Sequence, residues 1–207
     1  MIKAVLFDLD GTIINSEEGI TKCVQYALSC FGIEEPDRKK LLYFIGPPLD
    51  PVFREKYGFD ADKAWQAVLK YRERFDKTGI FECELYEGVA DTIRKLKEAG
   101  CVIALASSKP ETACRRILEH FSLTPYFDEI VGSTLDGSIS TKQQVLEELG
   151  RRMEHMQITK DEMCLIGDTE YDVIGADQFG IRCVGVSYGF GKREQLERAG
   201  PYQAIQV

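Results

Sequence analysis

Carboxylates that follow short apolar runs are the residues of this sequence best suited to chemistry. Asp8 and Asp10 follow the first such run, and Asp168 and Asp172, one helical turn apart, follow a later one. Two unit charges about 4 Å apart repel by roughly 4 kcal/mol at an effective dielectric constant near 20, so clustered carboxylates need protons or a cation. Oxygen ligands without histidine or cysteine favour Mg²⁺ over zinc or copper. The four aspartates therefore predict a magnesium site if the fold gathers them.

Two hydroxyls and one ammonium group complete the candidate set. Ser107 and Ser108 follow another apolar run, and Lys142 opens the helical pattern before the run that ends at Asp168. Each residue alone has an ordinary structural explanation, because aspartate and serine often cap helices and a lone lysine is usually exposed. Helix capping does not require all of them after successive runs. Their joint occurrence favours a functional site over a set of separate helix caps.

The elements that must position these residues are short, continuous apolar runs, in which apolar and polar residues do not alternate. Such runs are typical of strands covered on both faces, as in a parallel sheet. They occupy residues 4–7, 101–106, 163–166 and 183–186, with 127–131 as a weaker fifth candidate. Helical patterns lie between them, so the order predicts an α/β doubly wound, Rossmann-like parallel sheet. Ligands bind such sheets at the carboxyl ends of the strands, where the candidate residues would meet.

Two of the helices in this region have predicted N-terminal signals. Ser108-Lys109-Pro110-Glu111 has the pattern of a capping box with proline in the first turn. Ser140-Thr141-Lys142-Gln143 has the same pattern before the next helix. Helices are therefore expected to begin at these two segments.

Residues from about 14 to 82 have a different sequence pattern, with no apolar strand run and three amphipathic helical stripes. The sequence therefore predicts a small all-helical cap at 14–82, inserted after the first strand of a core made of 1–13 and 83–207. Gly46 and Pro47, in a turn at the middle of the insertion, are candidates for a loop that reaches the substrate. A plain connection between two helices is the alternative.

Composition limits the functional classes. The formal net charge of −8 repels polyanions, so we expect no nucleic-acid polymer as a partner. No run approaches the 18 apolar residues of a transmembrane helix, and the N-terminal run is too short for a signal peptide. The seven cysteines are scattered and odd in number, which is typical of reduced thiols. We expect a cytoplasmic protein with no membrane partner, as a monomer or a homodimer.

The motifs together resemble those of the haloacid dehalogenase (HAD) superfamily. The four matching segments, in chain order, are Phe7-Asp8-Leu9-Asp10-Gly11-Thr12, Ala106-Ser107-Ser108-Lys109-Pro110, Lys142 and Gly167-Asp168-Thr169-Glu170-Tyr171-Asp172. Their order and the helical cap match over the whole chain, and the chain is most similar to the phosphoglycolate-phosphatase-like branch. Residues 44–49 and 188–194 are similar to 5′-nucleotidase-like members of that branch. Members of the branch are expected to end in a helix, whereas residues 200–207 show no helical pattern.

The resemblance implies a Mg²⁺-dependent phosphomonoester hydrolase that acts on a small phosphorylated metabolite. Asp8 would be the nucleophile that forms an aspartyl-phosphate, and Asp10 the general acid and base. Lys142, Ser107 and Ser108 would bind the phosphoryl group. The resemblance assigns the metal to Asp8, the Asp10 carbonyl, Asp168 and Asp172.

Two other functions stay open from the sequence. A sugar phosphomutase of the same fold, similar to β-phosphoglucomutase, would release no free phosphate. A non-catalytic relative that only binds a phosphorylated ligand would have no need for the complete set of acids and lysine. Asp10 itself argues against a dehalogenase, because dehalogenating members lack this second aspartate.

Overall fold

The computed structural model describes residues 1–200 and 203–205. It separates into two compact units, one made of Met1–Asn15 with Leu85–Val207 and the other of Ser16–Glu84. The first unit carries the parallel sheet, and the second is helical.

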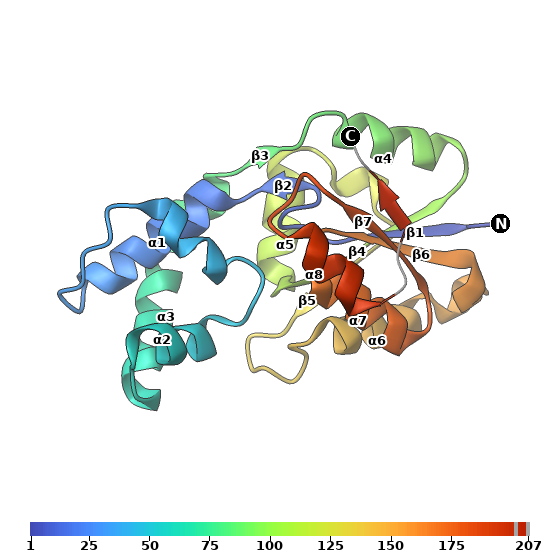
Figure 1. Cartoon of the computed structure of the whole chain (residues 1–207). Helices are drawn as coiled ribbons and strands as arrows, with labels where there is room; N and C mark the ends of the chain where they lie inside the picture. Colours follow the sequence, from blue (N-terminus) through green and yellow to red (C-terminus); the bar gives the residue numbers. More distant parts are fainter. Residues whose placement is uncertain (201–202, 206–207) are drawn as a thin grey trace. The chain divides into compact units, whose positions relative to one another are not determined.

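The sheet of the first unit has six parallel strands in the order β5-β4-β1-β6-β7-β8 (Figure 1). The strands are β1 (Ala4–Phe7), β4 (Val102–Pro110), β5 (Glu129–Ser133), β6 (Met163–Gly167), β7 (Arg182–Val186) and β8 (Gln203–Ile205). The apolar runs thus form the five strands expected of them, and the predicted doubly wound sheet with a helical insertion after its first strand is confirmed. The sixth strand, β8, was not expected, and its residues lie where no helical pattern was found.

Helices cover both faces of this sheet. They are α4 (Val89–Glu98), α5 (Glu111–His120), α6 (Lys142–Met153), α7 (Glu170–Phe179) and α8 (Arg193–Ala199), with short 3₁₀ turns η3 (Thr124–Tyr126), η4 (Glu154–Met156) and η5 (Lys160–Glu162). Leu6, Ala104 and Leu165 pack into one cluster with apolar residues of α6, α7 and α8. Their strand neighbours face the opposite side, where α4 and α5 contact β4. Burial on both faces explains why the strand sequences are continuously apolar.

The register of β1 creates the site at the carboxyl edge. Phe7 is level with Leu105 of β4 and with Ile166 of β6. The chain moves from β1 to one side through β4 and β5, and then crosses to the other side at β6. The end of β1 is therefore the point where strand order reverses, which is where open α/β sheets bind ligands.

Both predicted capping boxes are corrected by the structure. Ser108 caps no helix, because β4 continues to Pro110, and α5 begins at Glu111 without a side-chain cap. The residue before a proline avoids the helical region, which keeps this segment extended. The box before α6 is formed one residue later than predicted, by Thr141 and Gln144.

The insertion forms its own small core. Its helices are α1 (Glu17–Ser29), α2 (Leu49–Tyr57) and α3 (Ala61–Phe75), with 3₁₀ segments η1 (Arg38–Phe44) and η2 (Gly79–Phe81). Asp60 caps α3 by accepting from the backbone N–H of Lys63 at 2.8 Å. Phe44 and Phe53 are buried with ring centroids 4.8 Å apart. This core is aromatic, and its stripes match the helical periodicity of the sequence.

The insertion leaves and rejoins the core through two very short strands. β2 (Ile14–Asn15) and β3 (Glu84–Leu85) pair with each other in a separate two-stranded sheet. Strands of two residues carry no readable sequence pattern, so they were not predicted. Across the part of the chain that the structure describes, every helix is too short or too polar to span a bilayer.

Candidate active site

Asp8 is the first residue beyond β1 and lies among buried groups. Its backbone N–H donates to the Ile166 carbonyl at 2.9 Å, so the strand fixes the position of its side chain. Lys142 Nζ donates to Asp8 Oδ1 at 2.6 Å and to the Ala106 carbonyl at 2.7 Å. Both side chains are almost completely buried. The sheet and α6 therefore bring the predicted Asp8 and Lys142 into direct contact.

Lys142 neutralises a second carboxylate as well. Its Nζ lies 2.8 Å from Asp172 Oδ1, a close ion pair without the angle of a hydrogen bond. Asp172 Oδ2 accepts from the backbone N–H and the hydroxyl of Thr169 at 3.0 and 2.8 Å, which makes it part of a capping box at the start of α7. Asp172 thus serves as a helix cap and as a partner of Lys142 at the same time.

Asp168 is held by backbone donors and by a hydroxyl. Its Oδ2 accepts from the N–H groups of Phe190 and Gly191 at 2.7 and 3.3 Å, and its Oδ1 from the Thr12 hydroxyl at 3.4 Å. Gly11, with φ of +85°, passes so close that a Cβ there would lie 2.5 Å from Asp168 Cγ. A glycine is needed at position 11 for both reasons.

The loop that holds Asp168 is tied to the first motif. The Tyr188 hydroxyl donates to the Thr12 carbonyl at 2.9 Å, and its ring packs on Tyr86 with centroids 4.6 Å apart. The segment 188–194 carried a family resemblance in the sequence but no assigned role. Its contacts place residues 188–191 among those that orient the site.

Burial of several carboxylates perturbs their titration. Burial raises the pKa of Asp8 to about 6, and Lys142 opposes that rise. Burial, with the charges of Asp172 and Asp8, raises the pKa of Asp168 to about 8. Burial disfavours the charged form of Lys142, but Asp172 and Asp8 outweigh it and raise the pKa of the ammonium above its ordinary value. Asp8 and Asp168 therefore hold a proton more tightly than exposed carboxyl groups do, whereas Lys142 stays charged.

Asp10 has a partner that the sequence did not reveal. Lys109 Nζ lies 2.9 Å from Asp10 Oδ2, and both side chains are largely buried. Asp10 Oδ1 is buried without a hydrogen-bond donor among the residues that the structure describes. In the sequence Lys109 was only part of a supposed capping box. No local sequence signal indicates this contact, because it depends on the register shift between β4 and β5 at Ala106–Pro110.

The two serines and the two cap candidates have different surroundings. Ser107 is buried within β4, and its hydroxyl oxygen accepts from the Lys109 backbone N–H at 3.3 Å. Ser108 is half-buried in the same segment. Gly46 and Pro47 lie in the insertion, in the turn between η1 and α2, with Gly46 exposed at φ of +104°.

The donor set fits a hard divalent cation. Asp8, Asp168 and Asp172 each offer one carboxylate oxygen, and these three atoms lie within 4.8 Å of one another. All three residues are buried, and in the described structure the acids Asp8, Asp10, Asp168 and Asp172 face two lysines. Oxygen donors with uncompensated negative charge match the preference of Mg²⁺.

Comparison with known proteins identifies relatives along almost the whole chain. The model of the haloacid dehalogenase-like hydrolase family matches residues 5–186. A 5′-nucleotidase of Pseudomonas aeruginosa is 41% identical over 197 residues, which are 95% of this chain and 88% of that protein. Tyrosine-protein kinase PtkA of Mycobacterium tuberculosis is 31% identical over 94% of this chain, which spans 65% of the kinase.

A solved structure has the same architecture over the full chain. The crystal structure of a protein described as a predicted phosphatase from Clostridium acetobutylicum superposes with a TM-score of 0.92 at 44% identity. The superposition covers 100% of this chain and 95% of the other.

Proposed function

This chain belongs to the haloacid dehalogenase-like hydrolases, and on that premise we propose that it is a Mg²⁺-dependent phosphomonoesterase working through an aspartyl-phosphate. The observation that carries the proposal is the buried Asp8 at the end of β1, in contact with Lys142 and next to the acidic cluster. Asp10, two residues further, keeps one buried carboxylate oxygen free for a proton.

Asp8 would act as the nucleophile. A carboxylate oxygen of Asp8 forms a bond to phosphorus while the bond from phosphorus to the leaving oxygen breaks. In the second step a water oxygen attacks phosphorus, the bond to Asp8 breaks, and inorganic phosphate leaves. Strand β1 supports this role, since hydrogen bonds on both sides of the strand fix the direction from which Asp8 approaches.

Asp10 would move the protons of both steps. Its carboxyl group donates a proton to the leaving oxygen in the first step. Its carboxylate then takes a proton from the attacking water in the second step, which restores the starting state. The free Oδ1 suits this exchange because no other group of the described structure competes for it.

Lys142 and Ser107 would bind the transferring phosphoryl group together with the backbone of Ser108. Lys142 keeps Asp8 in place and supplies positive charge where negative charge accumulates. Asp8, the Asp10 carbonyl, Asp168 and Asp172 would hold Mg²⁺, with Asp172 directly or through water. The ion would supply the positive charge that the site lacks and draw charge from the phosphoryl oxygens.

For the substrate we propose a nucleoside 5′-monophosphate as the first candidate and phosphoglycolate as the second. The first choice follows from the relative named 5′-nucleotidase, and residues 14–82 would form the cap that selects the leaving group. Within this cap, Gly46 and Pro47 are the proposed contact turn. A closing cap would also exclude water during the first step.

The test is phosphate release from a panel of phosphomonoesters with Mg²⁺, comparing the wild type with D8N. The matched control is D177N, which changes an exposed aspartate on α7. We expect turnover by wild type and D177N, and acid-stable labelling of wild type but not of D8N by substrate carrying radioactive phosphorus. No turnover of any ester by the wild type would refute the hydrolase. Interconversion of sugar phosphates without free phosphate would favour the mutase instead.

A further inference from the structure

Lys109 stands out because it is an almost buried lysine with no role in the proposed chemistry. Its side chain is 7% exposed and that of Asp10 is 14% exposed. A lysine is rarely buried unless its charge is paired, and the pair here is the 2.9 Å contact with Asp10 Oδ2. The ammonium occupies one oxygen of the carboxylate and leaves Oδ1 without a partner in the described structure.

The backbone of Lys109 is fixed by an irregularity of the sheet. β4 and β5 pair at Ala106 with Val131 and again at Pro110 with Ser133, so β4 has two extra residues in this interval. The extra length lets the segment 107–109 bulge out at the carboxyl edge. Gly132 opposes the bulge, and a Cβ there would lie 2.5 Å from the Lys109 carbonyl oxygen.

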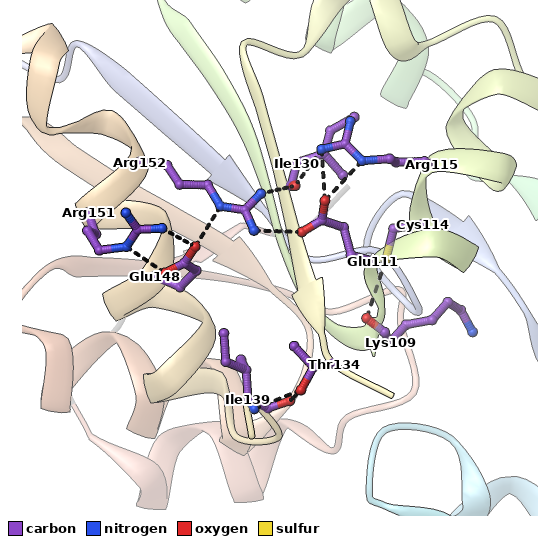
Figure 2. A network of polar contacts seen from close by, with 10 residues as sticks. All are labelled: Lys109, Glu111, Cys114, Arg115, Ile130, Thr134, Ile139, Glu148, Arg151 and Arg152. Carbon is purple, nitrogen blue, oxygen red and sulfur yellow. Dashed lines mark hydrogen bonds and ion pairs between the residues drawn. The ribbon is translucent and has the colours of Figure 1, made fainter. Parts of the chain in front are cut away.

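A network of ion pairs anchors the chain just after the bulge (Figure 2). Glu111 accepts from Arg115 at 2.9 Å and pairs with Arg152 of α6 at 3.0 Å. Both arginines also donate to the Ile130 carbonyl, at 3.2 and 3.3 Å. The Cys114 Sγ donates to the Lys109 carbonyl at 3.5 Å. The position of Lys109 is therefore determined on both sides of the residue.

We propose that Lys109 is a positioning residue that fixes the rotamer of Asp10, so that Oδ1 faces the oxygen to which the proton is delivered. The inference rests on the proposed function, because it assigns Asp10 the proton of the leaving group. Without the ammonium, the Asp10 carboxyl group rotates and delivers that proton less often. The loss then depends on how much the leaving group needs a proton.

A comparison of two leaving groups tests this role. If Lys109 had only a structural role, its loss would lower kcat/KM equally for both. An alkyl phosphate needs protonation of its leaving oxygen, whereas 4-nitrophenyl phosphate expels a stable anion. For K109M we expect kcat/KM to fall on the order of tenfold to a hundredfold with the alkyl ester, as part of the usual general-acid contribution. With the aryl ester the fall stays under about threefold, because that contribution is not needed there.

Three further variants define the comparison, and a fourth is held as a substitute. D10N shows the same selectivity with larger losses, and K109R recovers most of the alkyl-ester activity because it restores the ion pair. K97M is the matched control, since it removes a 2.6 Å pair with Asp128 before β5, at the opposite edge of the sheet. K109Q takes the place of K109M if the methionine variant does not fold, as judged by thermal unfolding.

The outcomes separate the two proposals. If the wild type hydrolyses neither ester, the proposed function fails. If the wild type hydrolyses both and K109M loses both equally or neither, the positioning role of Lys109 is wrong. An equal loss with a raised KM would indicate that Lys109 binds the phosphoryl group.

Discussion

The two edges of the parallel sheet hold ion pairs of the same length in opposite environments. At the amino edge Lys3 and Glu162 are 2.6 Å apart, with 58% and 23% of their side chains exposed. At the carboxyl edge Lys142 and Asp8 are also 2.6 Å apart, but only 5% and 11% exposed. The distance between the two charged groups therefore does not by itself determine how much an ion pair contributes to stability.

Burial separates the two edges in energy. Exposed pairs contribute about 0–1 kcal/mol, since water solvates the separated charges nearly as well. Breaking a buried pair costs about 3–5 kcal/mol, because the charge that remains is buried away from water without a partner. The carboxyl edge concentrates unfavourable charge where the proposed chemistry needs it, and the amino edge carries its charges at little cost.

The largest effect is expected from K142M. This change leaves Asp8 and Asp172 buried without their shared ammonium, so the free energy of unfolding should fall by about 3–5 kcal/mol at pH 7. Urea unfolding in the presence of chelator measures the loss. At pH 5 the loss should shrink, since Asp8 can then take up a proton. A loss below about 1 kcal/mol at pH 7 would place this edge in the same class as the exposed one.

The second expected effect is a pH dependence of the metal-free protein. The pKa values of Asp168 and Asp8, about 8 and about 6, lie above their ordinary value, so the folded state binds these protons more tightly than the unfolded state. The stability that these two groups contribute is fully present when the pH lies below the ordinary aspartate pKa. It is lost as the pH rises through about 6 for Asp8 and about 8 for Asp168. In chelator, Tm should fall on the order of 5 °C between pH 5 and pH 9 beyond the fall seen for D168N.

Added Mg²⁺ should reverse this fall and stabilise the protein more at pH 9 than at pH 5, as thermal unfolding would show. The pH dependence of stability that comes from Glu162 at the amino edge has the opposite sign, because Lys3 holds the pKa of Glu162 below its ordinary value. An equal effect of Mg²⁺ on the wild type and on D168N would contradict the role of the acidic cluster.

A smaller effect is expected from Y188F. The change removes the hydrogen bond to the Thr12 carbonyl but keeps the ring packed on Tyr86. We expect a loss of about 1 kcal/mol in stability, typical of one hydrogen bond. The Mg²⁺ concentration for half-maximal activity should also rise, because the loop that orients Asp168 loosens. Y26F, which removes an exposed contact with Glu73, serves as control and should change neither quantity.

The smallest effect belongs to the amino edge. K97M removes the pair with Asp128, both partly exposed, so the free energy of unfolding should change by less than about 1 kcal/mol. Urea unfolding beside K142M makes the comparison direct. A loss as large as that of K142M would mean that burial does not distinguish the two edges.

Much of this arrangement could be predicted from sequence, and the reasons are physical. Asp8 and Asp168 end continuous apolar runs, and parallel strands bring their carboxyl ends together, so their proximity followed from pattern alone. The place of Lys142 before the run that ends at Asp168 made it a candidate, but its role needed the family resemblance, because a lysine at the start of a helix is ordinarily exposed. Its burial depends on the packing of α6 against the sheet.

The errors came from features that depend on tertiary pairing. Ser108 has a good capping pattern, yet pairing of β4 with β5 as far as Pro110 keeps it extended. Lys109 was missed for the same reason, since the bulge that turns it toward Asp10 arises from the register of two strands. Local sequence cannot report a register shift.

The short ladder of β2 and β3 has a consequence for how such proteins diversify. Paired strands lie about 4.8 Å apart, so the chain leaves the core and returns to it at almost the same point. Any module whose two ends lie close together could be joined there with little loss of chain entropy and no change in the sheet. The catalytic scaffold and the inserted module can therefore be exchanged as separate parts, in evolution as well as in protein engineering.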